Sequence, residues 1–162
     1  MAKSKYILKA RDIDATNGLN KVHFLNPDAQ RINKSLGDLT GLTGLGFHIV
    51  EVPPGKASTE YHKHYFEDEC VYVLSGNGTT EIDDEMFEIG QGDFIAYPKN
   101  GPTHRIINTG VETLVCIVVG ERLAHDVGDY PRMGKRLYRN TGHAWDLVDI
   151  EKIDHPDAGQ KK

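Results

Sequence analysis

The stretch Pro54–Gly76, PGKASTEYHKHYFEDECVYVLSG, places two histidines and several carboxylates between segments that are typical of β-strands. Successive side chains of a strand point to opposite faces, so His62 and His64 point to the same face. Two imidazoles on one face can bind the same metal ion. We therefore expect the end of this strand to supply two ligands of a metal site.

A carboxylate is the third expected ligand. The chain offers three acids just after the histidines, Glu67, Asp68 and Glu69. Glu69 is favoured, because the apolar side chains of Val71 and Val73 share its face of the following strand. The odd offset from His64 to Glu69 breaks the alternation, which requires a turn or bulge between them. Asp68 remains an alternative.

The fourth expected ligand is His104, in the segment 90–110, GQGDFIAYPKNGPTHRIINTG. Residues 94–97 read as a short strand and 98–103 as a loop with proline and glycine, so His104 opens the next strand. Three imidazoles and one carboxylate suit Mn, Fe, Co, Ni, Cu or Zn, and suit Mg or Ca poorly. The sequence thus predicts one divalent transition metal ion held by His62, His64, Glu69 and His104.

The spacing of these residues resembles that of the cupin superfamily. The first conserved motif is matched by Gly55, His62, His64, Glu69 and Gly76, and the second by Gly92, Pro98, His104 and Asn108. The chain departs from the usual pattern by one extra residue ahead of His62 and one after Pro98. The resemblance implies a jelly-roll barrel, the double-stranded β-helix, with the metal inside. It implies no particular reaction, since the superfamily includes dioxygenases, isomerases, decarboxylases, epimerases, storage proteins and ligand sensors.

Turn signals and short apolar runs predict an all-β chain. The turn signals lie at 76–78, 83–85, 90–93, 100–102 and 108–110. No run between them has the period of a helix, and the apolar run 113–119 is expected to be a central strand buried on both faces. The 162 residues suit one domain.

We expect that domain to have three parts: an N-terminal extension over 1–40, the barrel over 41–120 and a C-terminal extension over 121–162. A strand is expected at 5–10, loops at 12–34 and a short strand at 136–139. The C-terminal extension is expected to pack on the barrel or on a partner subunit, because open sheet edges need covering. The same reasoning predicts a homodimer.

Charge and composition limit the classes of binding partner and the cellular location that we expect. The net charge is −5 and the basic residues are dispersed, which argues against nucleic acid and against an anionic membrane. Cys70 and Cys116 lie in apolar surroundings, and the first residues lack the apolar run of a signal peptide. A cytoplasmic location with two buried, inert thiols is the expectation.

Two classes of function remain open. The favoured class is a metal-dependent enzyme, isomerase-like or dioxygenase-like, acting on a small polar molecule such as a sugar derivative or a hydroxy or keto acid. The alternative is a non-catalytic binding module, a sensor or storage protein. A purely structural dimerisation unit is disfavoured, because buried charged ligands without a metal or partner cost stability.

No catalytic residue can be assigned from the sequence. The candidates for a general base are Glu51, Glu67, Tyr72 and Arg105. His23 and His48 are isolated and are expected to be surface or hydrogen-bonded residues. The remaining histidines, His125, His143 and His155, are expected to be solvated. Tyr61, Tyr65 and Tyr72 could reach a ligand, but aromatic residues beside a turn more often pack in the barrel wall.

Overall fold

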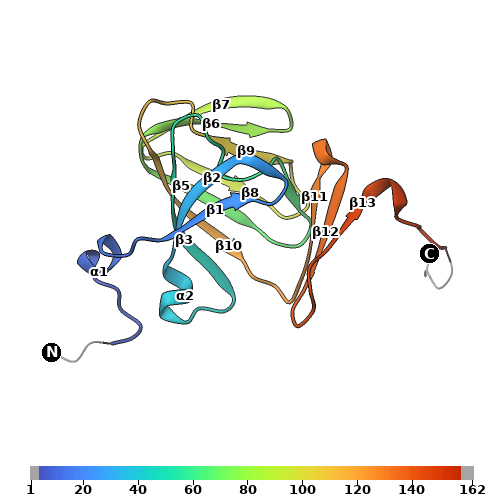
Figure 1. The fold of residues 1–162 in the computed structure, drawn as a ribbon, viewed down its shortest axis with the longest axis horizontal. Helices are drawn as coiled ribbons and strands as arrows, with labels where there is room; N and C mark the ends of the chain where they lie inside the picture. Colours follow the sequence, from blue (N-terminus) through green and yellow to red (C-terminus); the bar gives the residue numbers. More distant parts are fainter. Residues whose placement is uncertain (1–3, 158–162) are drawn as a thin grey trace.

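The computed structural model describes residues 4–157, and antiparallel strands dominate it (Figure 1). A six-stranded sheet has the order β1 (Leu19–His23), β2 (Asn26–Ser35), β3 (Leu45–Val52), β10 (Leu114–Glu121), β5 (Glu69–Ser75) and β8 (Phe94–Tyr97). A three-stranded sheet has the order β7 (Glu85–Gly90), β6 (Asn77–Ile82) and β9 (His104–Ile107). A four-stranded sheet has the order β13 (Asp146–Asp149), β12 (Lys135–Asn140), β11 (His125–Tyr130) and β4 (Lys63–His64).

Short helical segments lie before, between and after these strands. They are α1 (Ala10–Asp14), α2 (Leu36–Thr40), and the 3-10 turns η1 (Pro131–Met133) and η2 (Ile150–Lys152). The all-β prediction is confirmed. No helix of residues 4–157 has the length and apolar character needed to span a membrane.

The apolar core lies between the six-stranded and three-stranded sheets. It contains Val50, Val52, Val71, Val73, Ile89, Ile95, Tyr97, Ile106, Leu114 and Cys116. Strand β10 is central in the larger sheet, paired with β3 on one side and β5 on the other. Leu114 and Cys116 are buried, whereas Val115 and Ile117 on the opposite face are half-buried. The central position expected for this strand is confirmed. The expectation that both of its faces are buried was wrong, because only one face of the sheet meets the core.

The N-terminal expectations were wrong. Residues 5–10 form no strand, and the polar run 12–34 contains β1 and most of β2. Strand β2 pairs with β3 and thereby extends the larger sheet. These strands were missed because several of their inward side chains are polar, so the apolar alternation that marks a half-buried strand is absent.

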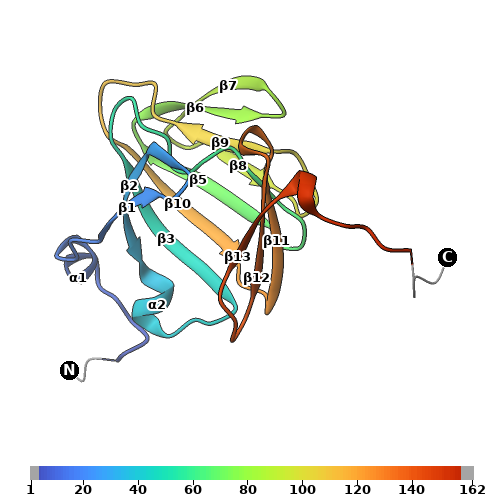
Figure 2. The same cartoon turned by 45° about the vertical axis from the view of Figure 1, so that its right-hand side comes forward.

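The C-terminal region adds three strands, β11 to β13, which stand beside the barrel on the side away from α1 (Figure 2). The short strand expected at 136–139 is confirmed as part of β12, while β11 and β13 were missed. Strand β11 buries Asp126 and Asp129, whose charges are balanced by Arg139 and Arg136 of β12. The division of the chain at residues 40 and 120 and the homodimer stay predictions.

Candidate metal centre

The side chains of the four predicted ligands lie close together. Hydrogen bonds between the backbones of His62 and His104 join the two motif segments. Potential ligand atoms of His62, His64 and Glu69 lie within 4.8 Å of one another. The Nε2 atom of His104 lies 3.7 Å from Oε1 of Glu69, and the ring centroids of His62 and His104 are 4.7 Å apart. The structure therefore brings all four side chains together.

The break in strand alternation expected after His64 is present, because β4 ends there and β5 begins at Glu69. Asp68 lies in this connection, and its carboxylate accepts a hydrogen bond of 2.7 Å from the backbone N–H of Lys99. Of the two acids, Glu69 is the one that faces the imidazoles.

Each histidine of the cluster has its Nδ1 atom next to an oxygen. His62 Nδ1 lies 2.8 Å from the carbonyl of Glu60, His104 Nδ1 lies 3.2 Å from the carbonyl of Pro102, and His64 Nδ1 lies 2.7 Å from Asp126. An acceptor at Nδ1 holds the proton on that nitrogen and leaves the Nε2 lone pair free for a metal. All three rings are held in the tautomer that a metal site needs.

Charge and burial favour the metal-binding protonation states of Glu69 and His62. Burial alone would raise the pKa of Glu69, but contact with His104 and the nearby His62 and His64 lower it to about 2. Burial, with repulsion from His104 and His64, lowers the pKa of His62 to about 3. At neutral pH the carboxylate is therefore ionised and His62 is neutral.

A buried atom without a partner indicates what the cluster lacks. Among residues 4–157, Nε2 of His104 is buried and has no hydrogen-bond partner. A buried polar atom left unpaired is costly, and coordination to a cation would satisfy it. Together with three Nε2 lone pairs and an ionised carboxylate, this donor set fits a divalent transition metal ion.

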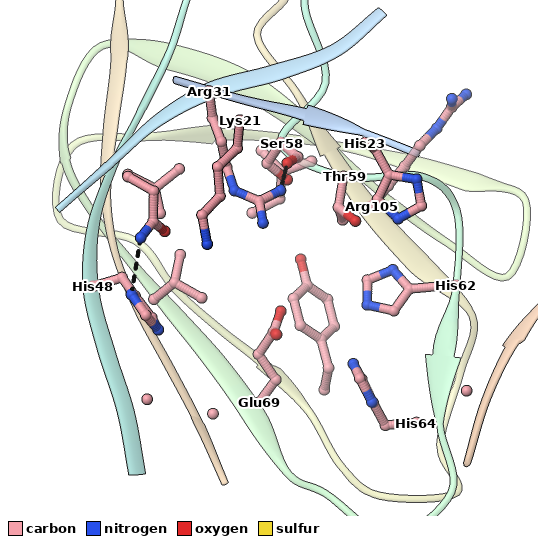
Figure 3. A pocket seen from close by; sticks show the side chains of 18 of the residues that line it. Lys21, His23, Arg31, His48, Ser58, Thr59, His62, His64, Glu69 and Arg105 are labelled. Atoms are coloured by element: carbon pink, nitrogen blue, oxygen red, sulfur yellow. Dashed lines mark hydrogen bonds between the residues drawn. The ribbon is translucent and has the colours of Figure 1, made fainter. Parts of the chain in front are cut away.

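The cluster lies in a cavity of about 610 Å³, a volume typical of small-molecule sites. The lining includes residues that the sequence did not single out as functional: Lys21, His23 and Arg31 from the first two strands, His48 from β3, and Asp126 and Tyr130 from β11. Figure 3 shows Lys21 and Arg31 on the wall facing Glu69. The sequence signal for this wall is the pair Lys21 and His23, which lie two positions apart and so share one face of a strand.

The four candidate bases divide into two pairs. Glu51 lies 3.1 Å from Lys34 and Tyr72 is 44% exposed, and neither residue lines the cavity. Glu67 and Arg105 do line it. Both are already paired, since Glu67 accepts a hydrogen bond of 2.7 Å from the N–H of Leu123 and Arg105 donates one of 2.6 Å to Glu81.

Residues 48–120 match the family described as the Cupin domain. The crystal structure of a putative sugar phosphate isomerase from Acidithiobacillus ferrooxidans is 51% identical, covers 94% of this chain and 97% of that chain, and has a TM-score of 0.90. This chain belongs to the cupin family. The predicted resemblance and the cupin barrel are thus confirmed.

Two further comparisons are more limited. A sugar phosphate isomerase of the cupin superfamily from Silicibacter pomeroyi is 24% identical, covers 90% of this chain and 96% of that chain, and has a TM-score of 0.79, a likeness of fold. An uncharacterised protein from Methanocaldococcus jannaschii is 44% identical over 59 residues. That match spans 36% of this chain and less than half, 46%, of the relative.

Proposed function

We propose that this cupin is a metal-dependent isomerase that acts on a sugar phosphate. The observation that carries the proposal is the buried, unpartnered Nε2 of His104 beside the ionised Glu69, within a cavity of substrate size. The similarity to a putative sugar phosphate isomerase over nearly the whole of both chains supports this reaction class over the dioxygenase-like alternative.

The metal ligands are proposed to be His62, His64, Glu69 and His104. These residues would hold a divalent ion, which would act as a Lewis acid toward a substrate oxygen. The protein residues supply proton donors. His23 Nδ1 accepts a hydrogen bond from the N–H of Leu25, so the neutral ring carries its proton on Nε2.

Two cavity residues hold a proton at neutral pH. Burial and the charge of Arg31 lower the pKa of His23, so its ring stays neutral with Nε2–H as a donor. Burial raises the pKa of Tyr130 to about 12, so its hydroxyl stays protonated. The Tyr130 ring centroid lies 5.2 Å from that of His23 and 6.0 Å from that of His62. These two groups can donate to substrate oxygens that lie beside the metal ligands.

Metal content tests the ligand set. Protein purified without a metal-affinity column should contain about one transition metal ion per chain by elemental analysis. His62→Ala and His104→Ala should lose most of it, and Glu69→Gln should lose less, because an amide oxygen still coordinates weakly. His125→Ala is the matched control, since His125 is exposed and bonds to Asn140. Unchanged metal in all three ligand variants would contradict the assignment.

Activity tests the reaction class. Metal-loaded protein should interconvert an aldose phosphate and its ketose phosphate, seen by proton NMR as a new isomer or as deuterium uptake from heavy water. His104→Ala should abolish this activity. Saturable binding of sugar phosphates without any conversion or exchange would favour the alternative, a non-catalytic sensor or storage protein.

A further inference from the structure

Two basic side chains face each other across β1 and β2. The antiparallel register places Lys21 directly opposite Arg31. Residues in this relationship have their Cβ atoms about 4.5–5.5 Å apart on the same face, and like charges there are destabilising. The arrangement costs stability unless an anion lies between or beside the two cations.

Neither cation has a carboxylate partner among residues 4–157. Arg31 donates to the backbone carbonyl of Ser58, a neutral acceptor, and Lys21 has no hydrogen bond or ion pair. Other basic side chains near the cavity are paired: Arg122 contacts Asp38, Arg105 contacts Glu81 and Arg139 contacts Glu67. Lys21 and Arg31 therefore differ from their basic neighbours in being free to bind a ligand.

Both side chains reach into the cavity that contains the metal-ligand cluster. Figure 3 shows them entering from β1 and β2, on the wall facing Glu69, with Ser58 and Thr59 beside Arg31. Burial lowers the pKa of Lys21 and the charge of Arg31 lowers it further. Burial also lowers the pKa of Arg31, although the charge of Glu69 opposes this shift. One cavity thus has a metal-ligand cluster on one wall and a pair of unpaired cations on the other.

We propose that Lys21 and Arg31 bind the phosphate group of the substrate, whose sugar carbons then lie toward His62, His64, Glu69 and His104. This inference rests on the proposed function and assigns the substrate's orientation in the same cavity. A phosphate dianion matches the two positive charges, whereas a carboxylate would leave one of them uncompensated. The fork of N–H groups on Arg31 suits two phosphate oxygens, and Lys21 supplies a further point charge.

Inorganic phosphate is the probe that tests this subsite without the metal. Metal-free wild-type protein should bind phosphate saturably in a calorimetric titration at pH 7.5 and low salt. Lys21→Met and Arg31→Met should each weaken that binding about tenfold or more. Absence of saturable phosphate binding to the wild type, or equal binding by all variants, overturns the proposal.

Lys34→Met is the matched control. Lys34 lies on β2 like Arg31, but an odd offset places it on the outer face, where it contacts Glu51. Its removal changes the net charge by the same amount and should leave phosphate affinity within twofold. A loss equal to that of Arg31→Met would mean that general charge attraction accounts for the binding. Acetate binding as tightly as phosphate would overturn the phosphate assignment.

Stability separates a binding role from a structural one. Because Lys21 and Arg31 repel each other, Lys21→Met should leave the thermal midpoint of the phosphate-free protein unchanged or higher, and should reduce the rise of that midpoint on phosphate addition. A lower midpoint in phosphate-free protein with an unchanged rise would overturn the proposal.

The two proposals can fail separately. Phosphate binding that depends on Lys21 and Arg31, without sugar phosphate conversion, would leave the subsite standing and refute the isomerase. Conversion of glucose and glucose 6-phosphate at equal kcat/KM, unchanged by Arg31→Met, would refute the subsite and leave the isomerase standing.

Discussion

His64 Nδ1 lies 2.7 Å from Oδ2 of Asp126, and this contact links the first metal-ligand segment to β11, 62 residues farther along the chain. Asp126 is 3% exposed and also accepts a hydrogen bond of 3.2 Å from the N–H of Phe66. Burial alone would lower the pKa of His64, but Asp126 and Glu69 raise it above its ordinary value. The carboxylate thereby fixes both the orientation and the tautomer of a proposed ligand.

Asp126→Asn should lower metal affinity about 10- to 100-fold, because it removes the charge that orients His64 and increases its basicity. Competition with a chromophoric chelator measures this loss. Asp129→Asn is the control, since Asp129 is buried on the same strand but pairs with Arg136 and Tyr65. An equal loss of metal affinity in both variants would show that Asp126 acts only through the stability of β11.

Local spacing explains why the cluster could be predicted. Strand alternation places His62 and His64 on one face, and the turn signals before His104 mark it as the start of a strand. Both inferences need only neighbouring residues. The carboxylate was harder to predict, because the connection before Glu69 breaks the alternation. In the structure Glu69 faces the imidazoles, whereas Asp68 accepts a hydrogen bond from Lys99.

Long-range pairing explains what could not be predicted. Lys21 and Arg31 lie on strands whose cavity-facing residues are polar, so these strands carry no apolar alternation. Asp126 becomes a partner of His64 only because β11 pairs with β4. In the sequence, a buried Asp in a polar segment cannot be told from a solvated one. The folded structure distinguishes them, because it places an arginine of β12 beside Asp126.

Two glycines of the first conserved motif allow a matched test of backbone constraint. Gly76 has a φ of 82° and Gly55 a φ of 76°, conformations that cost an L-residue about 1–2 kcal/mol. A Cβ at Gly76 would lie 2.7 Å from the carbonyl oxygen of Thr113, whereas a Cβ at Gly55 would meet no atom within 4 Å.

Gly76→Ala should therefore lower the free energy of unfolding clearly more than Gly55→Ala, which should lose only about 1–2 kcal/mol. Urea denaturation followed by circular dichroism measures both losses. Equal losses of unfolding free energy in the two variants would mean that the backbone segments at Gly76 and Thr113 can move apart without a cost in stability.

The two cysteines should be unreactive in the folded protein. Burial raises the pKa of Cys116 to about 12, and burial together with Glu69 raises the pKa of Cys70. Because the thiolate is the reactive form, Ellman's reagent at pH 8 should label neither thiol within minutes, and should label both in guanidinium chloride. Fast labelling that disappears in Cys70→Ser would show that Cys70, the half-buried thiol, is accessible.

Glu81 should make the stability of the fold pH-dependent. Its buried carboxylate on β6 accepts hydrogen bonds from Arg105, at 2.6 Å, and from Arg132 next to β11. Hydrogen bonding from Arg132 lowers the pKa of Glu81 below 4.5, against the opposing effect of burial. A lowered folded-state pKa stabilises the protein above the unfolded-state value, and this stabilisation is lost as pH falls from about 4.5 through the folded-state pKa.

At pH 7, Glu81→Gln should cost about 2–4 kcal/mol of unfolding free energy, since two arginines lose their charged acceptor. The difference from wild type should shrink as pH falls from about 4.5 through the lowered folded-state pKa, because the wild-type carboxyl group then also becomes protonated. Thermal melts from pH 3 to 8 measure this convergence. Asp84→Asn is the control, because Asp84 contacts the same Arg132 but its side chain is 78% exposed, so its loss should stay within about 0.5 kcal/mol. If the loss of unfolding free energy in Glu81→Gln stays constant across this pH range, then the charge of Glu81 contributes nothing to stability. Only the shape of the side chain would then matter at this position.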